Sequence, residues 1–453
     1  MQQSQSLNIP ALLAILAGVV IVTLDISLTS TALPAIAVGI GIEPATAIWV
    51  VNTYYLAVVA ALLSLAALGE IYGHRKIFYA GLVVFSLGSL ICGLASSLPM
   101  LMAGRALLGM GAAAVSATTP AIIRYIYPPH RLGRGLGLYA LVVGVAFAAG
   151  PPAASAVLSV ADWPWLYYLN APVALLALGL AIRGLPETER NIRRFDPVSC
   201  VLCAVTFSCL LLAVAGMASL GLPPIMAAIA GFIVCGAVLL KHEANHIAPV
   251  LGADLLRRPA FALSSLTSIC SFSVQGLVFV VLPFLFLTMG FTQVEAGLLI
   301  MPWPATLIVM TVVASRLSDR VPPGLLGGIG LAILSVGLAL LATMSADSGN
   351  LEIGWRLVLC GIGFGFFQSP NMVALMRSAP KERSGSAGGI LALSRLLGQS
   401  FGAAAVAFWM SSGLENSPEA AIWFGVALAA IGCIFSLLRL LPSLHISPDP
   451  ANA

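Results

Sequence analysis

The chain has 453 residues, of which 60% are hydrophobic and only 8% are charged. Water-soluble domains carry roughly 25% charged residues, so this composition excludes a water-soluble globular fold. The formal net charge is +4, but the Lys and Arg residues fall singly between apolar runs, which argues against a surface that binds nucleic acid. We therefore expect an all-α integral membrane protein whose helices are surrounded by lipid.

Fourteen apolar runs are long enough to cross a membrane as helices, since a spanning helix needs about 20 apolar residues. A twelve-helix alternative would require the seventh and eighth runs to be re-entrant, although each is long enough to span. The expected helices are 9–33, 46–68, 77–95, 99–123, 134–158, 167–184, 197–216, 222–241, 260–288, 294–315, 324–345, 352–376, 384–410 and 419–441.

Positive charge is segregated among the loops that join these helices. All but three of the 21 basic residues lie in the even-numbered loops or at the C-terminal end, whereas the odd-numbered loops carry only acids. Lys and Arg are retained on the cytoplasmic side during insertion. We therefore expect a multi-pass protein of the cytoplasmic (inner) membrane with both termini in the cytoplasm.

Four charged residues lie inside apolar runs: Asp25, Arg105, Arg356 and Arg395. A charge at membrane depth costs a few kcal/mol, so such residues usually face a polar cavity or a partner. Asp25 lies roughly 12 Å and Arg105 roughly 9 Å from the outer ends of their helices, at 1.5 Å per residue. Similar depth permits an ion pair or a shared cavity.

The balance between burial and a nearby cation would let Asp25 take up and release protons, which makes Asp25 and Arg105 the candidate proton-coupling residues. Two other roles remain open for Asp25, namely a structural hydrogen bond to a neighbouring helix and a direct contact with substrate.

A faint internal repeat runs through the chain. Residues 105–111, Arg-Ala-Leu-Leu-Gly-Met-Gly, are echoed by residues 356–363, and the basic loop 131–135 is echoed by 381–385, in both cases eight helices apart. Repeated halves are typical of secondary transporters. The expected domains are an N-terminal six-helix bundle (1–185), a linker with two inserted helices (186–259) and a C-terminal six-helix bundle (260–453).

Two motifs carry a resemblance to a known family. Residues 24–34, Leu-Asp-Ile-Ser-Leu-Thr-Ser-Thr-Ala-Leu-Pro, resemble L-D-x-T-x-V-N-x-A-L-P, and residues 163–172, Trp-Pro-Trp-Leu-Tyr-Tyr-Leu-Asn-Ala-Pro, resemble W-x-W-x-F-x-x-N-x-P. Both patterns are typical of the fourteen-helix drug:proton antiporter branch of the major facilitator superfamily, and the resemblance spans most of the chain.

The resemblance implies a major facilitator fold and a secondary transporter rather than an enzyme. It implies export of lipophilic, cationic drugs or antiseptics in exchange for protons by alternating access, with the proton gradient as energy source and no cofactor. The expected partners are membrane lipids and a small lipophilic substrate, and the chain is expected to act as a monomer. An exporter of a metabolite or peptide-like compound on the same fold is the alternative.

The turn between the second and third expected helices resembles the gating loop of the superfamily, G-x-L-A-D-R-x-G-R-K. Residues 66–76 follow this pattern with departures, since alanine, glutamate and isoleucine replace its first glycine, its aspartate and its first arginine. By resemblance Glu70, Gly73, Arg75 and Lys76 are candidate gating residues. The alternative is that the two basic residues form a simple cytoplasmic anchor.

Two further segments are gating candidates by the same resemblance. Asp319 and Arg320 keep the Asp-Arg pair in the second-half copy of the loop. Gly150 and Pro151 resemble part of the antiporter signature G-x-x-x-G-P-x-x-G-G. Proline bends a helix and small neighbours let another helix approach closely, so this pair could separate two access states.

Polar and aromatic residues within the predicted helices are candidates for substrate contact, because aromatic faces suit lipophilic cations. Each could equally belong to the packed interior. These candidates are Asn52, Tyr54, Tyr55, Gln275, Trp303, Gln368 and Asn371.

Arg395 belongs to a stretch that resembles the branch's R-x-x-G-x-x-x-G pattern, in which the arginine is structural. Arg356 has no such counterpart, and a functional role stays open for both.

A separate signal points to a different class of protein. His242, Glu243 and His246 form a literal H-E-x-x-H, which on a helix would bind zinc with the glutamate as general base. Such a site needs a third ligand, and Asp254 is the nearest acid. Residues 249–261 also resemble the transporter branch's ordinary connector. A membrane zinc metalloprotease is thus a remote alternative, and no metal is expected.

Overall fold

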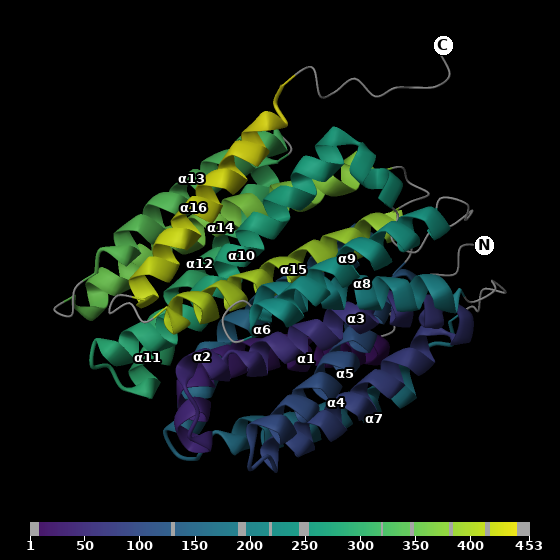
Figure 1. Ribbon diagram of the computed structural model, residues 1–453. Helices are drawn as coiled ribbons and strands as arrows, with labels where there is room; N and C mark the ends of the chain where they lie inside the picture. Colours follow the sequence, from purple (N-terminus) through teal and green to yellow (C-terminus); the bar gives the residue numbers. More distant parts are fainter. Residues whose placement is uncertain are drawn as a thin grey trace. The chain divides into compact units, whose positions relative to one another are not determined.

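The structure, a computed structural model, consists of helices joined by short turns throughout the residues that it describes (Figure 1). Fourteen helical segments are long and apolar enough to cross a membrane, which confirms the predicted number of spans and the predicted fold class. The described residues are 9–127, 132–188, 196–216, 220–243, 253–318, 320–344, 348–379, 384–412 and 417–441.

The helices group into two units. Unit 1 comprises Met1–Ala213 and Met226–Leu239, and unit 2 comprises Val214–Ile225 and Leu240–Ala453. The first seven helices are α1 (Ile9–Ile40), α2 (Pro44–Ala47), α3 (Trp49–Tyr72), α4 (His74–Gly93), α5 (Leu98–Ile126), α6 (Leu132–Leu158) and α7 (Pro164–Gly184). The two inserted helices are α8 (Pro197–Gly216) and α9 (Leu222–Glu243).

Unit 2 begins its bundle after a short 3₁₀ turn, η2 (Ala253–Arg257). Its helices are α10 (Pro259–Thr288), α11 (Gln293–Ile300), α12 (Pro302–Leu317), α13 (Pro323–Ala342), α14 (Asn350–Ser378), α15 (Ser384–Ser411) and α16 (Ser417–Leu438). The domain boundaries expected at residues 185 and 259 stay a prediction.

Two of the expected helices are interrupted, one near its first turn and one after about two turns. The span expected at 46–68 is divided at Ile48 into α2 and α3, and the span expected at 294–315 is divided at Met301 into α11 and α12. Pro302 follows the second break directly, where its missing N–H and fixed φ suit the first position of a new helix. Each break is therefore followed by the longer part of its span.

Helix packing is the same in the two units. In unit 1, α5 packs on α3 and α4, while α1 packs on α6 and α7. In unit 2, α14 packs on α12 and α13, while α10 packs on α15 and α16. The two six-helix sets thus repeat one arrangement, in which α1 corresponds to α10, α5 to α14 and α6 to α15.

Glycines allow close helix pairs to form in both units. A Cβ at Gly81 on α4 would lie 3.0 Å from the carbonyl oxygen of Gly111 on α5. A Cβ at Gly330 on α13 would lie 2.6 Å from the carbonyl oxygen of Gly363 on α14. Small residues let backbones approach within van der Waals distance, which stabilises helix pairs in lipid without any hydrophobic driving force.

This glycine register corrects one detail of the predicted repeat. Gly109 and Gly361 occupy equivalent positions, since a Cβ on either would meet the backbone oxygen of a facing aromatic residue, at 2.6 Å and 2.5 Å respectively. Arg105 lies four residues before the first glycine, whereas Arg356 lies five residues before the second. One residue is about 100° around a helix, so Leu357 rather than Arg356 is the structural counterpart of Arg105.

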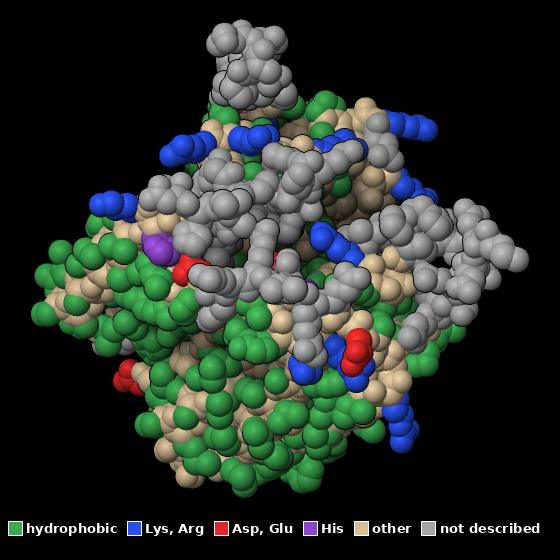
Figure 2. All heavy atoms as spheres, turned by 90° about the vertical axis from the view of Figure 1, so that its right-hand side faces the viewer, with side chains coloured by type: hydrophobic (Ala, Val, Ile, Leu, Met, Phe, Trp, Pro, Cys, Tyr) green, Lys and Arg blue, Asp and Glu red, His purple; other side chains and the backbone are tan. Residues whose placement is uncertain are grey.

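The outer surface is largely apolar. Figure 2 shows one face of the molecule, where Lys and Arg side chains are more prominent than Asp and Glu and broad hydrophobic areas lie beside them. On α9 the side chains of Leu222, Ile233 and Val234 are more than half exposed. Helices that present such surfaces are stable where lipid covers them.

Candidate functional site

A buried ion pair lies at the centre of unit 1. Arg105 Nη1 on α5 is 2.6 Å from Asp25 Oδ2 on α1, and each side chain is only 1% exposed. Their similar depth permits an ion pair or a shared cavity, and the structure shows the ion pair. A charge-assisted hydrogen bond of this length is among the stronger interactions in proteins.

Both partners are held by further polar groups. Asn170 on α7 donates from Nδ2 to Asp25 Oδ1 at 2.8 Å. Arg105 donates from Nε to the carbonyl oxygen of Val50 at 3.1 Å and from Nη1 to Thr29 Oγ1 at 3.4 Å. The site therefore connects four helices, α1, α3, α5 and α7.

Aromatic rings cover the guanidinium. The Cζ atom of Arg105 is 4.5 Å from the ring centroid of Tyr54 and 5.9 Å from that of Tyr167. Thr29 donates from Oγ1 to the Tyr167 hydroxyl at 3.3 Å, which fixes the second ring beside the pair. These contacts stabilise the cation by its attraction to the aromatic faces.

The local sequence explains why these groups meet. Gly109 lies one turn beyond Arg105 on α5, and a Cβ there would meet the carbonyl oxygen of Tyr54. Val50 lies one turn before Tyr54 on α3, so the close approach at the glycine also brings the Val50 carbonyl within reach of the guanidinium. Residues four apart share a helix face, and one glycine thereby positions two contacts of the site.

The α1 side of the site is also packed through a glycine. A Cβ at Gly150 on α6 would overlap the side chain of Ser27, and Ser27 donates from Oγ to the carbonyl oxygen of Phe147 at 2.8 Å. Asp25 is two residues before Ser27. The predicted gating residues Gly150 and Pro151 therefore lie where α6 contacts the helix that carries the buried acid, and Pro151 is within an uninterrupted α6.

The candidate gating turn requires a glycine at one position. Gly73 separates α3 from α4 with a φ of +97°, a conformation that L side chains rarely adopt. Arg75 donates from Nη1 to the carbonyl oxygen of Leu185 at 3.2 Å, whereas Glu70 and Lys76 are exposed. The turn thus contacts the end of α7 through one of its basic residues.

The remaining predicted sites are less complete. Arg320 is exposed, and Asp319 lies outside the described residues. His242 is half-buried near the end of α9, and His246 also lies outside the described residues. Among the residues that the structure describes, no group of three His, Cys, Asp or Glu side chains could hold a metal ion.

The candidate substrate residues belong to both units, three to unit 1 and four to unit 2. Tyr54 covers Arg105, and its ring centroid is 5.9 Å from that of Tyr55. Asn52 is buried, and its Oδ1 has no hydrogen-bond partner among the described residues. Gln275 accepts at Oε1 from Gln399 at 3.0 Å.

Two other substrate candidates belong to unit 2. Trp303 is fully buried, with its ring centroid 5.8 Å from that of Phe279 and 6.3 Å from that of Phe364. Its Nε1 has no hydrogen-bond partner within the described part of the chain. Gln368, one turn beyond Phe364 on the same helix, is half-buried.

The side chain of Asn371 is hydrogen-bonded to a buried arginine. Arg439 donates from Nη1 to Asn371 Oδ1 at 2.7 Å and to Ser264 Oγ at 3.0 Å. Asn371 in turn donates from Nδ2 to Ser268 Oγ at 2.8 Å. Burial lowers the pKa of Arg439 to about 10, so this guanidinium still carries its charge at neutral pH.

Sequence reasoning missed several members of these networks. Asn170 stands within the quoted motif 163–172 and is a polar residue in an apolar helix, which is the signal that could have identified it. Arg439 stands among the basic residues assigned to the cytoplasmic C-terminal end, yet it is only 7% exposed. The Val50 carbonyl carried no signal, because backbone atoms contribute only through tertiary contact.

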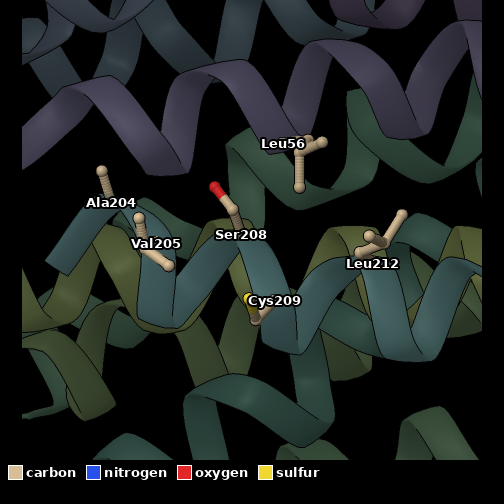
Figure 3. Close-up of a pocket in the computed structure, with 6 residues that line it drawn as sticks. All are labelled: Leu56, Ala204, Val205, Ser208, Cys209 and Leu212. Carbon is tan, nitrogen blue, oxygen red and sulfur yellow. The ribbon is translucent and has the colours of Figure 1, made fainter. Parts of the chain in front are cut away.

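A hollow in unit 1 lies apart from the ion pair. Its volume is about 250 Å³, and its lining comes from α3 and α8 (Figure 3). The lining residues are Leu56, Ala204, Val205, Ser208, Cys209 and Leu212. This lining is almost wholly apolar, so it suits a hydrocarbon chain and offers nothing to hold a charged group.

Comparison with known proteins gives a consistent result. The sequence model of the Major Facilitator Superfamily matches residues 15–403. The uncharacterized transporter YebQ of Escherichia coli (strain K12) is 43% identical over 446 residues, covering 97% of this chain and 98% of the relative. The multidrug resistance protein Stp of Mycobacterium tuberculosis (strain CDC 1551 / Oshkosh) is 29% identical, covering 89% of this chain and 77% of the relative.

Among solved structures, the crystal structure of a D-xylose-proton symporter superposes with a TM-score of 0.72 at 15% sequence identity. The superposition covers 97% of this chain and 99% of the symporter. The superposition shows that the two proteins share a fold, and at this low sequence identity it shows no more than that.

Proposed function

We propose that this chain, which belongs to the major facilitator superfamily, is a proton-coupled exporter of small lipophilic compounds that works by alternating access. The observation that carries the proposal is the Asp25–Arg105 pair, in which a carboxylate and a guanidinium are buried at membrane depth. Ionisable residues inside a membrane bundle are costly, and proton relays are a common reason for their presence.

Protonation of Asp25 would change the electrostatics of the site. A neutral carboxyl no longer compensates the buried guanidinium, which then depends on the Val50 carbonyl, the Thr29 hydroxyl and the Tyr54 ring. Removing one partner of a buried pair is strongly unfavourable for the other. Proton binding therefore acts on the contact between α1 and α5, and a change in that contact is the coupling step that we propose.

The similarity to Stp supports drug-like substrates, and the basic loops support an inner-membrane location with cytoplasmic termini. The proton gradient would supply the energy without a cofactor, and the chain would act as a monomer. A cationic substrate stays a prediction. In unit 1 a cation would find the buried Asp25 carboxylate already neutralised by Arg105.

The test is dye accumulation in inverted membrane vesicles with an acidic lumen, using cationic rhodamine 123 and anionic fluorescein. Wild-type vesicles should accumulate at least one dye, and nigericin should abolish accumulation by collapsing the pH gradient. Asp25→Asn should abolish the gradient-dependent part because asparagine cannot carry a proton. Asp162→Asn is the matched control, since this acid is exposed.

Gradient-driven accumulation that survives Asp25→Asn would contradict the coupling role, and a wild type that accumulates neither dye would contradict export of such compounds. Competition by unlabelled metabolites or peptides, but not by drugs, would favour the alternative exporter of a metabolite or peptide-like compound.

A further inference from the structure

Arg395 lies deep inside a membrane span of unit 2. The apolar part of α15 extends from Ala387 to Ser411, and Arg395 is eight residues from its beginning and sixteen from its end. At 1.5 Å per residue these separations are roughly 12 Å and 24 Å. A guanidinium at that depth is costly in hydrocarbon, so it must reach water or a counter-charge.

Among the described residues, no side chain or carbonyl oxygen accepts a hydrogen bond from Arg395, and no carboxylate pairs with it. Its side chain is nevertheless half-buried rather than extended into the open. The other arginines at membrane depth differ in this respect. Arg105 pairs with Asp25, and Arg356 pairs with Glu352 on its own helix.

The position of Arg395 on α15 can be fixed from the glycines that follow it. A Cβ at Gly398 would lie 2.6 Å from the carbonyl oxygen of Ile269, and Gly402 meets α10 four residues further along at Ser273. Arg395 is nearly two turns before Gly402, so it lies on the same side of α15 as the α10 contact.

Between these two contacts α10 and α15 each advance by four residues, so the two helices run in parallel. Arg395 is three residues before Gly398 and Leu266 is three residues before Ile269, so these two residues lie at the same level. Leu266 is 42% exposed, so α10 leaves open space at this level. Arg395 is therefore at the border of an uncovered part of unit 2 and not inside its packed interior.

Charge is unevenly distributed along unit 2. In α10 to α16 the acids are Glu295, Glu352 and Glu419, and each stands in the first turn of its helix. Consecutive helices joined by a short segment are antiparallel, so the first turn of α14 is at the opposite end from the beginning of α15. Glu352 is therefore at the far end of the bundle from the beginning of α15.

A second buried guanidinium strengthens the positive field on this side. Arg439 contacts Ser264, two residues before Leu266, and its acceptors are the neutral Asn371 and Ser264. The α10 helix itself contains neither Asp nor Glu. Two guanidinium groups therefore flank the same part of α10 without a carboxylate from any of these helices, and such a site attracts anions.

We propose that Arg395 is the anchor for a carboxylate group on the compound that the protein transports. This inference rests on the proposed function, because it names the substrate class of that exporter. The proposed substrate is anionic, whereas the family resemblance implies a cationic one. Arginine suits this role since its planar fork binds a carboxylate through two parallel hydrogen bonds.

The test is equilibrium dye binding to purified protein in phosphatidylcholine nanodiscs, where no anionic lipid competes and no gradient is needed. Fluorescence anisotropy gives the Kd for fluorescein, its methyl ester and rhodamine 123. Wild type should bind fluorescein more tightly than either of the other two dyes. Arg395→Gln should weaken fluorescein binding by roughly thirtyfold, as loss of one partner of a desolvated charge pair does, and leave rhodamine 123 binding within about threefold.

Arg395→Lys should retain part of the fluorescein affinity, because it keeps the charge but loses the fork. The matched control is Arg377→Gln, which removes the same charge from an exposed position on α14. It should bind fluorescein like wild type. The methyl ester comparison uses wild type alone, so it remains decisive if Arg395→Gln does not fold.

Three outcomes would overturn the proposal: no saturable fluorescein binding to wild type, equal affinity for fluorescein and its methyl ester, or equal weakening of fluorescein and rhodamine 123 by Arg395→Gln. Failure of the proposed function has a different signature. Gradient-driven accumulation that survives Asp25→Asn in the vesicle assay would refute the coupling role, and the binding results for wild type and the Arg395 variants would still stand.

Discussion

The two six-helix sets share one packing arrangement but treat charge in opposite ways. Unit 1 buries a carboxylate together with its guanidinium, at Asp25 and Arg105, and gives each further hydrogen bonds. Unit 2 has no carboxylate on the corresponding helix α10 and leaves Arg395 without a partner among the described residues. Glycine contacts fix the common fold, whereas single polar positions can change from one half to the other without disturbing it.

The largest expected effect comes from breaking the pair in unit 1. Arg105→Ala leaves Asp25 buried and uncompensated, which should lower the free energy of unfolding by about 3–5 kcal/mol. Thermal unfolding in mild detergent, followed by tryptophan fluorescence, measures the change. The double variant Asp25→Asn/Arg105→Gln should recover much of the loss, because no charge then remains buried. An unaltered melting temperature for Arg105→Ala would contradict a tight ion pair.

The next effect compares two buried amides. Asn170→Leu removes a hydrogen bond to the Asp25 carboxylate, and Asn371→Leu removes one from the Arg439 guanidinium. Hydrogen bonds to charged groups contribute about 1.5–3 kcal/mol, so both variants should be destabilised by similar amounts. We expect only Asn170→Leu to change the pH dependence of transport. A similar change in Asn371→Leu would mean that proton coupling is not confined to unit 1.

A third comparison tests the packing that the units have in common. Gly81→Val should push α4 away from α5, and Gly330→Val should push α13 away from α14. Overpacking of this kind typically lowers the free energy of unfolding by about 1–3 kcal/mol. The two losses should be nearly equal in the same unfolding measurement. Gly354→Val is the control, since no atom lies within 4 Å of a Cβ there. Unequal losses would show that the two contacts are not equivalent.

The smallest effect is expected at the pair within α14. Glu352→Gln removes the partner of Arg356, but Glu352 is 43% exposed. Partly exposed pairs four residues apart contribute at most about 0.5 kcal/mol. Stability and dye transport should both remain near wild-type values. A loss as large as that of Arg105→Ala would place a second essential ion pair in unit 2.

Much of the fold could be predicted because the signals are local. Each span is an apolar run of sufficient length, so the fourteen helices follow from the sequence alone. The two breaks at Ile48 and Met301 lie within apolar runs and could not be located by hydropathy. The predicted repeat aligned Arg356 with Arg105, which is wrong by one residue. Sequence similarity does not show which glycine contacts a facing helix, so it could not set the alignment.

The site was predictable only in part. A lone acid and a lone arginine at similar depth identified Asp25 and Arg105, because charge inside an apolar helix is rare. Asn170, the Val50 carbonyl and the covering rings depend on which helices are neighbours, and that information is tertiary. Arg439 escaped for a different reason, since it stands just beyond a span, where arginine is usually solvated.

The glycine contacts between α4 and α5, and between α13 and α14, also limit how the protein can move. Where one backbone touches another there are no side-chain rotamers to adjust, so neither helix can slide or turn against its partner. Each pair must travel as one rigid body. Any motion that opens the two sides of the membrane in turn therefore has to keep these backbone contacts and change the contacts that the pairs make with other helices.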